Sequence, residues 1–199
     1  RAGMPTQGRT VTVFERIYPI QQINSHPAER DFLTALAQVL PKHVRPILVT
    51  DAGFRSAWFR EIARYGWDYV GRIRNNLKVQ CHEDASWRAC ASLHAGAGRR
   101  AEDLGAYRIV QSAPVMCRLV RIRHARKHRE QLTRAGLPQQ GTAARKARSG
   151  AREPWILATS LPSGQSFEAA KIVAIYSKRM QIEESFRDLK SHRYGMGFE

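Results

Sequence analysis

A run of charged and aromatic side chains near the C-terminus has the spacing expected of a metal ligand beside a phosphate backbone. The run reads YSKRMQIEESFRDLK. No Gly or Pro occurs between Phe167 and Gly195, so the sequence predicts one long helix there. At about 100° per residue, one quadrant of that helix carries Tyr176, Arg179, Glu183, Arg187 and Lys190. A carboxylate among cations suits a metal ligand next to a polyphosphate, but ion pairs along a solvated helix face explain the same spacing.

A second acid, Asp51, directly follows the short apolar run Ile47-Leu48-Val49. That run predicts a buried strand, and α/β folds place functional groups at the C-terminal ends of strands. The alternative is that Asp51 caps the helix predicted to begin at Ser56. The pattern around Asp51 therefore leaves a catalytic and a structural interpretation open.

Taken together, the two stretches resemble the DDE transposases of the IS4 family of insertion sequences. The family signature is Tyr, two residues, Arg, three residues, Glu, six residues and Lys, and the C-terminal run matches all four positions. Glu184 also fits the signature. The stretch VTDAGFRSAWFREIARYGWDYVGRIR is similar to the family's second-aspartate region, including its Asp-x-Gly-Phe turn. The resemblance rests on motifs over roughly residues 9–76 and 153–199, and on composition alone between them.

The resemblance implies a fold and a chemistry. The fold is α/β, an RNase H-like core with a mixed sheet and helices, interrupted by a β-rich basic insertion. The chemistry is metal-dependent DNA strand cleavage and strand transfer, with two Mg²⁺ ions that Mn²⁺ can replace. Asp51 and Glu183 correspond to the second catalytic aspartate and the catalytic glutamate. The implied partner is double-stranded DNA, at the transposon ends and the target, bound by a dimer.

Other residues resemble the family's DNA contacts. Tyr176, Arg179 and Lys190 match contacts to the DNA end, and Arg187 lies on the same predicted helix quadrant. Local pairing of Arg179 with Glu183 is the alternative. Trp155 stands where relatives stack a tryptophan on a flipped base, and the alternative is a core tryptophan at a strand start.

The family's first catalytic aspartate has no counterpart in the sequence. Glu29 and Asp31 are the only acids between Arg16 and Asp51, and both fall in a helical pattern. The chain reads as a piece of a longer protein, and we expect it to bind DNA without cutting it. Two alternatives follow: a DNA-binding protein derived from a transposase, and another RNase H-fold nuclease that cuts without joining strands.

Composition agrees with a polyanionic partner. The 199 residues carry a formal charge of +16 and a pI of about 10.7. Residues 118–152 hold eleven Lys or Arg and one acid, which is typical of an arm that contacts phosphate. No apolar run approaches the ~18 residues of a membrane span, and three cysteines without C-x-x-C spacing suit a reducing compartment. We therefore predict a bacterial cytoplasmic protein with no membrane partner.

The remaining pattern predicts three regions. Residues 1–76 form the first part of the core, with a loop at 1–8, strands at 10–18, 46–51 and 67–74, and helices at 28–40 and 56–65. Residues 77–153 form the β-rich basic insertion, with strands at 78–81, 107–112 and 117–124 and a flexible loop near 134–152. Residues 154–199 return to the core with a strand at 155–160 and the long helix.

Overall fold

The computed structural model describes residues 1–22, 25–124, 141–142 and 153–190, and for residues 187, 189 and 190 the backbone alone. The loop predicted near 134–152 lies almost wholly outside the described residues, as does most of the basic run. The descriptions below concern the described residues.

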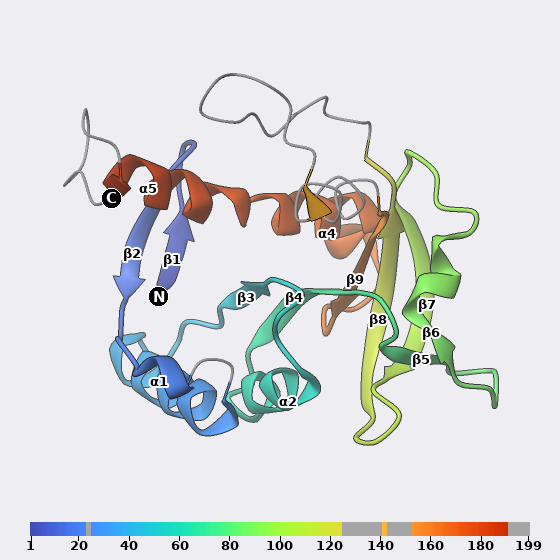
Figure 1. The fold of residues 1–199 in the computed structure, drawn as a ribbon, viewed down its shortest axis with the longest axis horizontal. Helices are drawn as coiled ribbons and strands as arrows, with labels where there is room; N and C mark the ends of the chain where they lie inside the picture. Colours follow the sequence, from blue (N-terminus) through green and yellow to red (C-terminus); the bar gives the residue numbers. More distant parts are fainter. Residues whose placement is uncertain (23–24, 125–140, 143–152, 191–199) are drawn as a thin grey trace.

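Seven strands form one mixed sheet, in the order β3-β4-β9-β8-β7-β5-β6 (Figure 1). Their bounds are β3 (Ile47–Thr50), β4 (Asp68–Ile73), β5 (Lys78–Cys81), β6 (Arg88–Ala89), β7 (Glu102–Ile109), β8 (Val115–Ile122) and β9 (Trp155–Thr159). β3 and β4 run parallel, and every other neighbouring pair in this sheet is antiparallel. This mixed α/β sheet confirms the predicted fold class and is consistent with an RNase H-like transposase core.

The strands predicted as an insertion extend this same sheet, because β8 pairs with β9 along five residues. The division of the chain into domains at 76 and 153 stays a prediction. What the structure adds is that the insertion and the core share one continuous row of strands.

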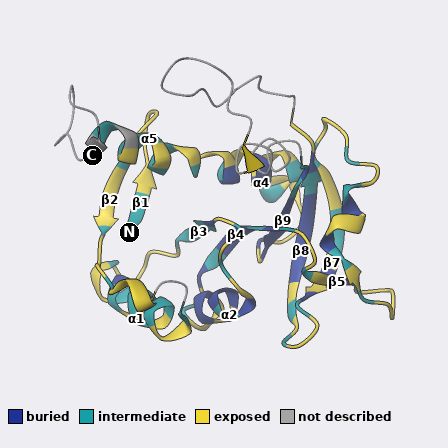
Figure 2. Ribbon diagram, viewed as in Figure 1, coloured by how far each residue is buried: buried dark blue, intermediate teal, exposed yellow. Residues whose placement is uncertain are grey.

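Helices cover both faces of the sheet. α1 (His26–Val39) and α2 (Ser56–Arg64) bury Leu33, Leu36, Phe59 and Ile62 on one face. α4 (Ala169–Ser177) packs Ile172, Val173 and Tyr176 against Val70, Val120 and Leu157 on the other. Figure 2 shows α2, β8 and β9 as mostly buried, so the core lies between these layers. Short 3-10 turns occur at η1 (Ile20–Gln22), η2 (Cys90–His94) and η3 (Gln165–Phe167).

The first fourteen residues form a separate hairpin. β1 (Ala2–Pro5) pairs antiparallel with β2 (Thr10–Phe14) in a two-stranded sheet of its own. The loop predicted at 1–8 is therefore wrong, and the strand predicted at 10–18 ends at Phe14. α5 (Met180–Lys190) lies against this hairpin, with Arg9 and Asp188 in an ion pair of 2.6 Å.

The single long helix predicted from Phe167 is also wrong, because the chain breaks between α4 and α5 at Lys178 and Arg179. The amides of Lys178 and Arg179 each donate to the carbonyl three residues earlier, which tightens the chain into a 3-10-type turn. The Ser177 hydroxyl donates to the Val173 carbonyl at 2.8 Å, a bond that bends helices. The break lets α4 pack on the large sheet while α5 packs on the hairpin.

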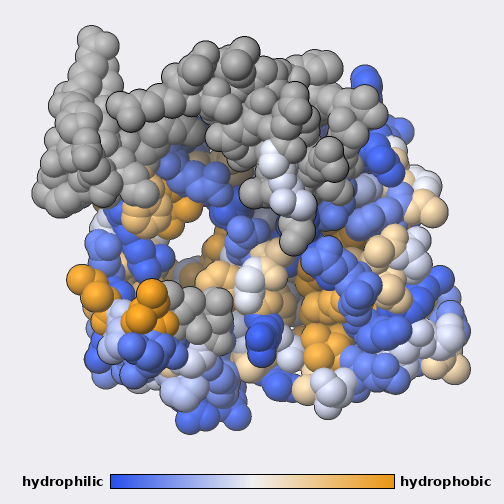
Figure 3. All heavy atoms as spheres, in the orientation of Figure 1, coloured by the Kyte–Doolittle hydropathy of each residue, from blue (hydrophilic) through white to orange (hydrophobic). Residues whose placement is uncertain are grey.

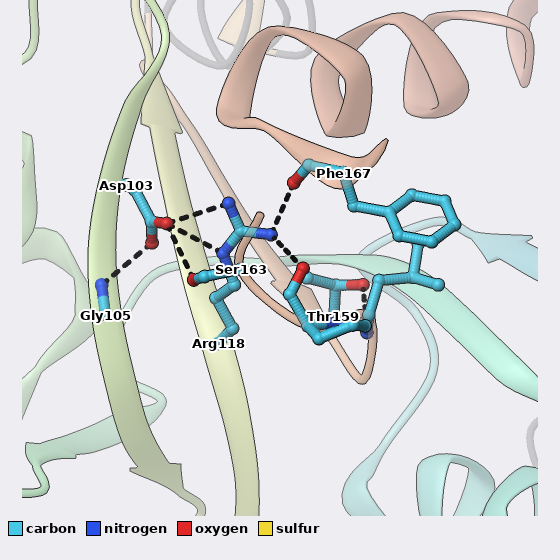
Figure 4. Close-up of polar contacts among 8 residues, drawn as sticks. Asp103, Gly105, Arg118, Thr159, Ser163 and Phe167 are labelled. Atoms are coloured by element: carbon cyan, nitrogen blue, oxygen red, sulfur yellow. Dashed lines mark hydrogen bonds and ion pairs between the residues drawn. The ribbon is translucent and has the colours of Figure 1, made fainter. Parts of the chain in front are cut away.

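A buried arginine ties the insertion strands to the turn before α4 (Figure 4). Arg118 on β8, with 8% of its side chain exposed, contacts Asp103 on β7 at 2.7 Å. Its Nη1 also donates to the carbonyls of Pro162 at 2.9 Å and Phe167 at 2.6 Å. Asp103 accepts a further bond from the Ser163 hydroxyl. The entry into α4 is therefore held from β7 and β8.

Within the described residues no helix is long and apolar enough to cross a membrane. Cys90 and Cys117 are buried thiols and Cys81 is half-buried. Burial raises the pKa of the Cys90 and Cys117 thiols to about 12, so both remain protonated.

Candidate active site

Asp51 and Glu183 meet at one guanidinium, although 131 residues separate them in the chain. Arg179 Nη1 lies 2.8 Å from Glu183 Oε1 and 3.5 Å from Asp51 Oδ2. Because both oxygens contact the same nitrogen, they are separated by no more than the sum of those distances, about 6 Å. Asp51 follows the end of β3, Arg179 lies in the turn between the helices, and Glu183 is in the first turn of α5. Two carboxylates this close can bind one divalent cation or two adjacent ones.

Asp51 is positioned by its own turn. Its Oδ1 accepts from the Ala52 amide at 2.7 Å, and its carbonyl accepts from the Phe54 amide. α2 begins at Ser56, and its N-cap is Arg55, which makes no side-chain capping bond within the described chain. The capping interpretation of Asp51 is therefore wrong, and its carboxylate is available to other groups. Its side chain is 55% exposed and that of Glu183 is 46% exposed.

The pKa of the Arg179 guanidinium reflects its burial and its acidic and phenolic neighbours. Burial alone would lower the pKa of this guanidinium, but Tyr176, Asp51 and Glu183 together raise it. Arg179 also lies over the Tyr176 ring, 5.8 Å from its centroid. The contact with Glu183 is the local pairing that the sequence left open, and the same nitrogen also reaches Asp51. The guanidinium thus occupies the position between the two carboxylates that a cation would share.

Tyr176 is buried under this site, with 2% of its surface exposed. Burial raises the pKa of its hydroxyl, although the positive charge of Arg179 opposes that rise. The hydroxyl has no hydrogen-bond partner among the described residues. Its contact with DNA stays a prediction, and in this structure its ring packs edge-on against Trp155.

Trp155 stands between two aromatic rings. The Tyr176 ring meets it edge-on at 4.8 Å between centroids, and the His124 ring lies at 4.0 Å with a tilt of 58°. Trp155 is half-buried and His124 is exposed. The core and base-stacking interpretations of Trp155 both remain compatible with this position, and base stacking stays a prediction.

Arg187 and Lys190 fall on the backbone of α5, and their side chains lie outside the described residues. Their predicted DNA contacts are therefore not addressed by the structure.

Within the part of the chain that the structure describes, no third acid joins Asp51 and Glu183. Among the described residues, no group of three or more His, Cys, Asp or Glu side chains is arranged to hold a metal ion. Asp31 accepts from the Tyr18 hydroxyl at 2.6 Å and pairs with Arg16 at 3.2 Å. Glu29 lines a cavity that also reaches Asp51, and burial raises the pKa of its carboxyl. The described chain thus contributes two converging carboxylates of the three that the resemblance implies.

That cavity, of about 790 Å³, separates the hairpin from the large sheet. Its walls come from β1, β3, α1 and the turn before α5, and Figure 3 shows an opening between the hairpin and β3. Phe32 and Leu36 of α1 lie on one side, and Ile175 and Ile182 lie on another. β3 ends the large sheet and β1 pairs only with β2, so within the described chain each has one unpaired edge.

Two residues near the site were not predicted from the sequence. Arg72 on β4 is 12% exposed and couples electrostatically to Tyr176 and Asp51. His124 contacts Trp155 from the end of β8. Arg72 is one of several arginines that follow Asp51 in the sequence, and charge alone does not choose among them. No motif marks His124, because its contact depends on how β8 pairs with β9.

The comparison with known proteins agrees with this geometry. A family model described as "Transposase DDE domain" matches residues 19–197. None of the curated proteins compared with the chain matches it. The family match spans most of the chain and includes the strand end at Asp51, the turn at Arg179 and the helix of Glu183, and the chain belongs to the transposase DDE domain family.

Proposed function

We propose that this chain is the catalytic core of a DNA transposase of the IS4 type, acting by metal-dependent cleavage and transfer of DNA strands. The observation that supports it best is the convergence of Asp51 and Glu183 on Arg179. The C-terminal end of β3 and the first turn of α5 bring together two acids that are far apart in the sequence. The Tyr176 and Trp155 rings and Arg72 lie beside them. Such a site serves phosphoryl transfer, where positioning and charge compensation dominate catalysis.

Each residue has a distinct role in this proposal. Asp51 and Glu183 would hold the divalent ions, and their hard oxygen donors fit Mg²⁺ or Mn²⁺. When bound, two such ions supply activation of the attacking oxygen and stabilisation of the leaving one. With the ions held by the carboxylates, Arg179 would contact a DNA phosphate, for which a guanidinium is suited. Lys190 and Arg187 add phosphate contacts along α5.

The third carboxylate comes from an extended segment in the cavity between β1 and β3. The cavity is lined by apolar side chains such as Phe32, Leu36 and Ile182, and the unpaired edges of β1 and β3 suit an added strand. A strand placed there would pair with both unpaired edges and join the two sheets. Its end would lie near Asp51 and Arg179, where an acid completes the set.

The natural setting of this activity is double-stranded DNA in the bacterial cytoplasm, with two copies of the protein bringing two transposon ends together. A DNA-binding protein without catalysis is the second candidate, favoured by the absence of a third acid among the described residues.

Metal and DNA binding by the purified chain test the proposal. We expect Asp51→Asn and Glu183→Gln each to lower Mn²⁺ affinity, measured by calorimetry, by roughly tenfold or more. Both variants should still shift duplex DNA in the presence of a chelator, because the basic surface is unchanged. Affinity for DNA should fall steeply with salt in every variant.

Matched controls are Asp68→Asn and Asp188→Asn. Asp68 starts the neighbouring strand and pairs with Arg45 at 3.0 Å, and Asp188 lies in α5 and pairs with Arg9 at 2.6 Å. Neither should change Mn²⁺ affinity. Equal losses in the controls would show that Asp51 and Glu183 form no specific metal site.

A further inference from the structure

Two arginines at the end of β8, Arg121 and Arg123, hold the loop that joins η2 to β7. Their guanidinium groups donate at 2.6–3.2 Å to the backbone carbonyls of Leu93, His94, Ala95 and Ala97. The amide of Arg123 also donates to the carbonyl of Gly98 at 2.8 Å. The loop sequence Ala-Gly-Ala-Gly has no side-chain donor for these carbonyls, so the arginines satisfy them. The shape of the loop is therefore set by the strand beside it.

A glycine with positive φ gives this loop its turn. Gly96 has φ 77°, in the left-handed region that residues with a side chain disfavour. A Cβ on Gly96 would also lie 3.5 Å from Nη2 of Arg121, whereas a Cβ on Gly98 would meet the Arg100 amide nitrogen at 4.0 Å, an ordinary contact distance. The loop conformation thus depends on Gly96 far more than on Gly98.

The loop ends in two exposed arginines, Arg99 and Arg100. Within the described chain, neither side chain has a hydrogen bond or an ion pair. The next residue, Ala101, packs in the same apolar cluster as Trp155 and Ile175. The two unpaired charges therefore lie at the end of the sheet that carries α4 and the start of β9.

We propose that residues 95–100 form a binding site for the backbone of double-stranded DNA, separate from the site of Asp51 and Glu183. Arg99 and Arg100 each contact one phosphate, which a guanidinium can bind with two parallel hydrogen bonds. Such contacts fix the position of a duplex without reading its sequence. The inference deepens the proposed function and rests on it for the identity of the partner.

Arg121 and Arg123 are positioning residues in this inference. The charge of Arg121 is already paired with Glu102 at 2.7 Å, and both guanidinium groups are engaged by loop carbonyls. Because they order the loop before DNA arrives, less conformational entropy is lost on binding. The geometry of the loop should therefore affect DNA affinity as well as the charge that it carries.

The salt dependence of duplex binding tests the phosphate contacts. The intact chain and Arg99→Gln/Arg100→Gln are titrated against one labelled duplex by anisotropy, at several salt concentrations. Each phosphate contact contributes about 0.9 to the slope of log affinity against log salt, so the slope of the double variant should be shallower by about 1.8. The matched control is Arg60→Gln/Arg108→Gln, which removes equal charge near the turn between β7 and β8. Its slope should stay within about 0.5 of that of the intact chain.

A second pair of variants tests the loop geometry without changing the charge. Gly96→Ala puts a side chain at positive φ beside Arg121, and it should lower duplex affinity by at least about threefold. Gly98→Ala should leave the affinity unchanged. Circular dichroism and the melting temperature check that both variants fold.

The outcomes separate this inference from the proposed function. An unchanged slope for Arg99→Gln/Arg100→Gln, or an equal loss of slope in Arg60→Gln/Arg108→Gln, overturns the inference. If Gly96→Ala binds DNA as tightly as Gly98→Ala, the ordered loop does not position the arginines. If the intact chain binds no duplex at all, the proposed function fails instead.

Discussion

Arg179 contacts both acids of the site, Asp51 after β3 and Glu183 in α5. Its spacing from Glu183 is visible in the sequence, because residues four apart on a helix face meet. Its contact with Asp51 is not visible, because it requires β3 and the turn before α5 to lie side by side. The same limit applies to Trp155: the sequence marks the tryptophan, while the flanking rings of His124 and Tyr176 come from strand register and helix docking.

Replacing Arg179 tests whether its guanidinium competes with a metal ion for Asp51 and Glu183 or holds the two carboxylates in place. In Arg179→Gln the two carboxylates lose their shared cation, and their mutual repulsion then favours a metal ion. Because the side chains of Asp51 and Glu183 are about half exposed, the ion pairs are weak. We expect Mn²⁺ affinity to rise by up to about fivefold and DNA affinity to fall.

Calorimetry and gel shift measure the two effects. Arg9→Gln is the control, because Arg9 also pairs with a carboxylate of α5, Asp188, at the hairpin side. A fall in Mn²⁺ affinity for Arg179→Gln, as large as that for Asp51→Asn, would mean that Arg179 organises the carboxylates rather than competing with the metal.

At the scale of elements, local patterns predicted most of the core. The β3-α2-β4 unit was predicted within a residue or two, since its apolar runs and the glycine at the end of α2 are local signals. Gly66 has φ 68°, as expected of a helix C-terminal glycine. β1 was missed because Ala2–Pro5 contains Gly and Pro, which disfavour strands, and pairing with β2 overrides that preference. The break between α4 and α5 was missed because no helix-breaking residue marks it. It arises because α4 packs on the large sheet while α5 packs on the hairpin.

The contacts of Arg118 join β7, β8 and the turn before α4, and their effect on stability can be tested. Arg118→Met leaves Asp103 and two carbonyls without their donor, and we expect it to lower the free energy of unfolding by about 2–4 kcal/mol at neutral pH. Urea unfolding measures the change. Arg108→Met, on the neighbouring strand with one long contact to Gln80 at 3.4 Å, is the control and should cost far less.

The same network gives this stabilisation a pH dependence. Burial alone would raise the pKa of the Asp103 carboxyl, but bonds from Arg118, the Gly105 amide and Ser163 outweigh it, so the pKa is lowered from 3.8. A depressed carboxyl pKa stabilises the fold above the unfolded value and loses that contribution as pH falls through the folded value. The difference in unfolding free energy between wild type and Arg118→Met should therefore narrow below about pH 4. If the difference in unfolding free energy stays constant with pH, the ion pair of Arg118 with Asp103 does not account for the stabilisation.

At the scale of the molecule, the described chain has two sheets and a cavity between their facing edges. Composition predicted a basic DNA-binding protein, and motifs predicted two of three acids, yet neither indicated the cavity. The cavity depends on strand order, which a single sequence does not fix: β2 pairs with β1, and β3 pairs with β4. Among the described residues, the shortage of acids and the unpaired edges of β1 and β3 support the proposed strand independently of each other.

The last prediction concerns the strand proposed to fill the cavity between β1 and β3. We expect the 199-residue chain to shift transposon-end DNA but leave it intact with Mg²⁺ or Mn²⁺, because two carboxylates supply too few ligands to hold two ions. A synthetic peptide of about six residues, with alternating apolar side chains and a terminal aspartate, should raise the melting temperature by pairing with β1 and β3. It should also support nicking, and Glu183→Ala should abolish that nicking.

A peptide with asparagine in place of the aspartate separates the effect of the carboxylate from the effect of the added strand. It should raise the melting temperature equally, since backbone pairing and apolar burial are unchanged, but give no nicking. If neither peptide raises the melting temperature, the cavity does not accept a strand. If the chain nicks DNA unaided, in a reaction that Glu183→Ala removes, the third acid is already present. Glu29 is then the first residue to replace, because it lines the same cavity as Asp51.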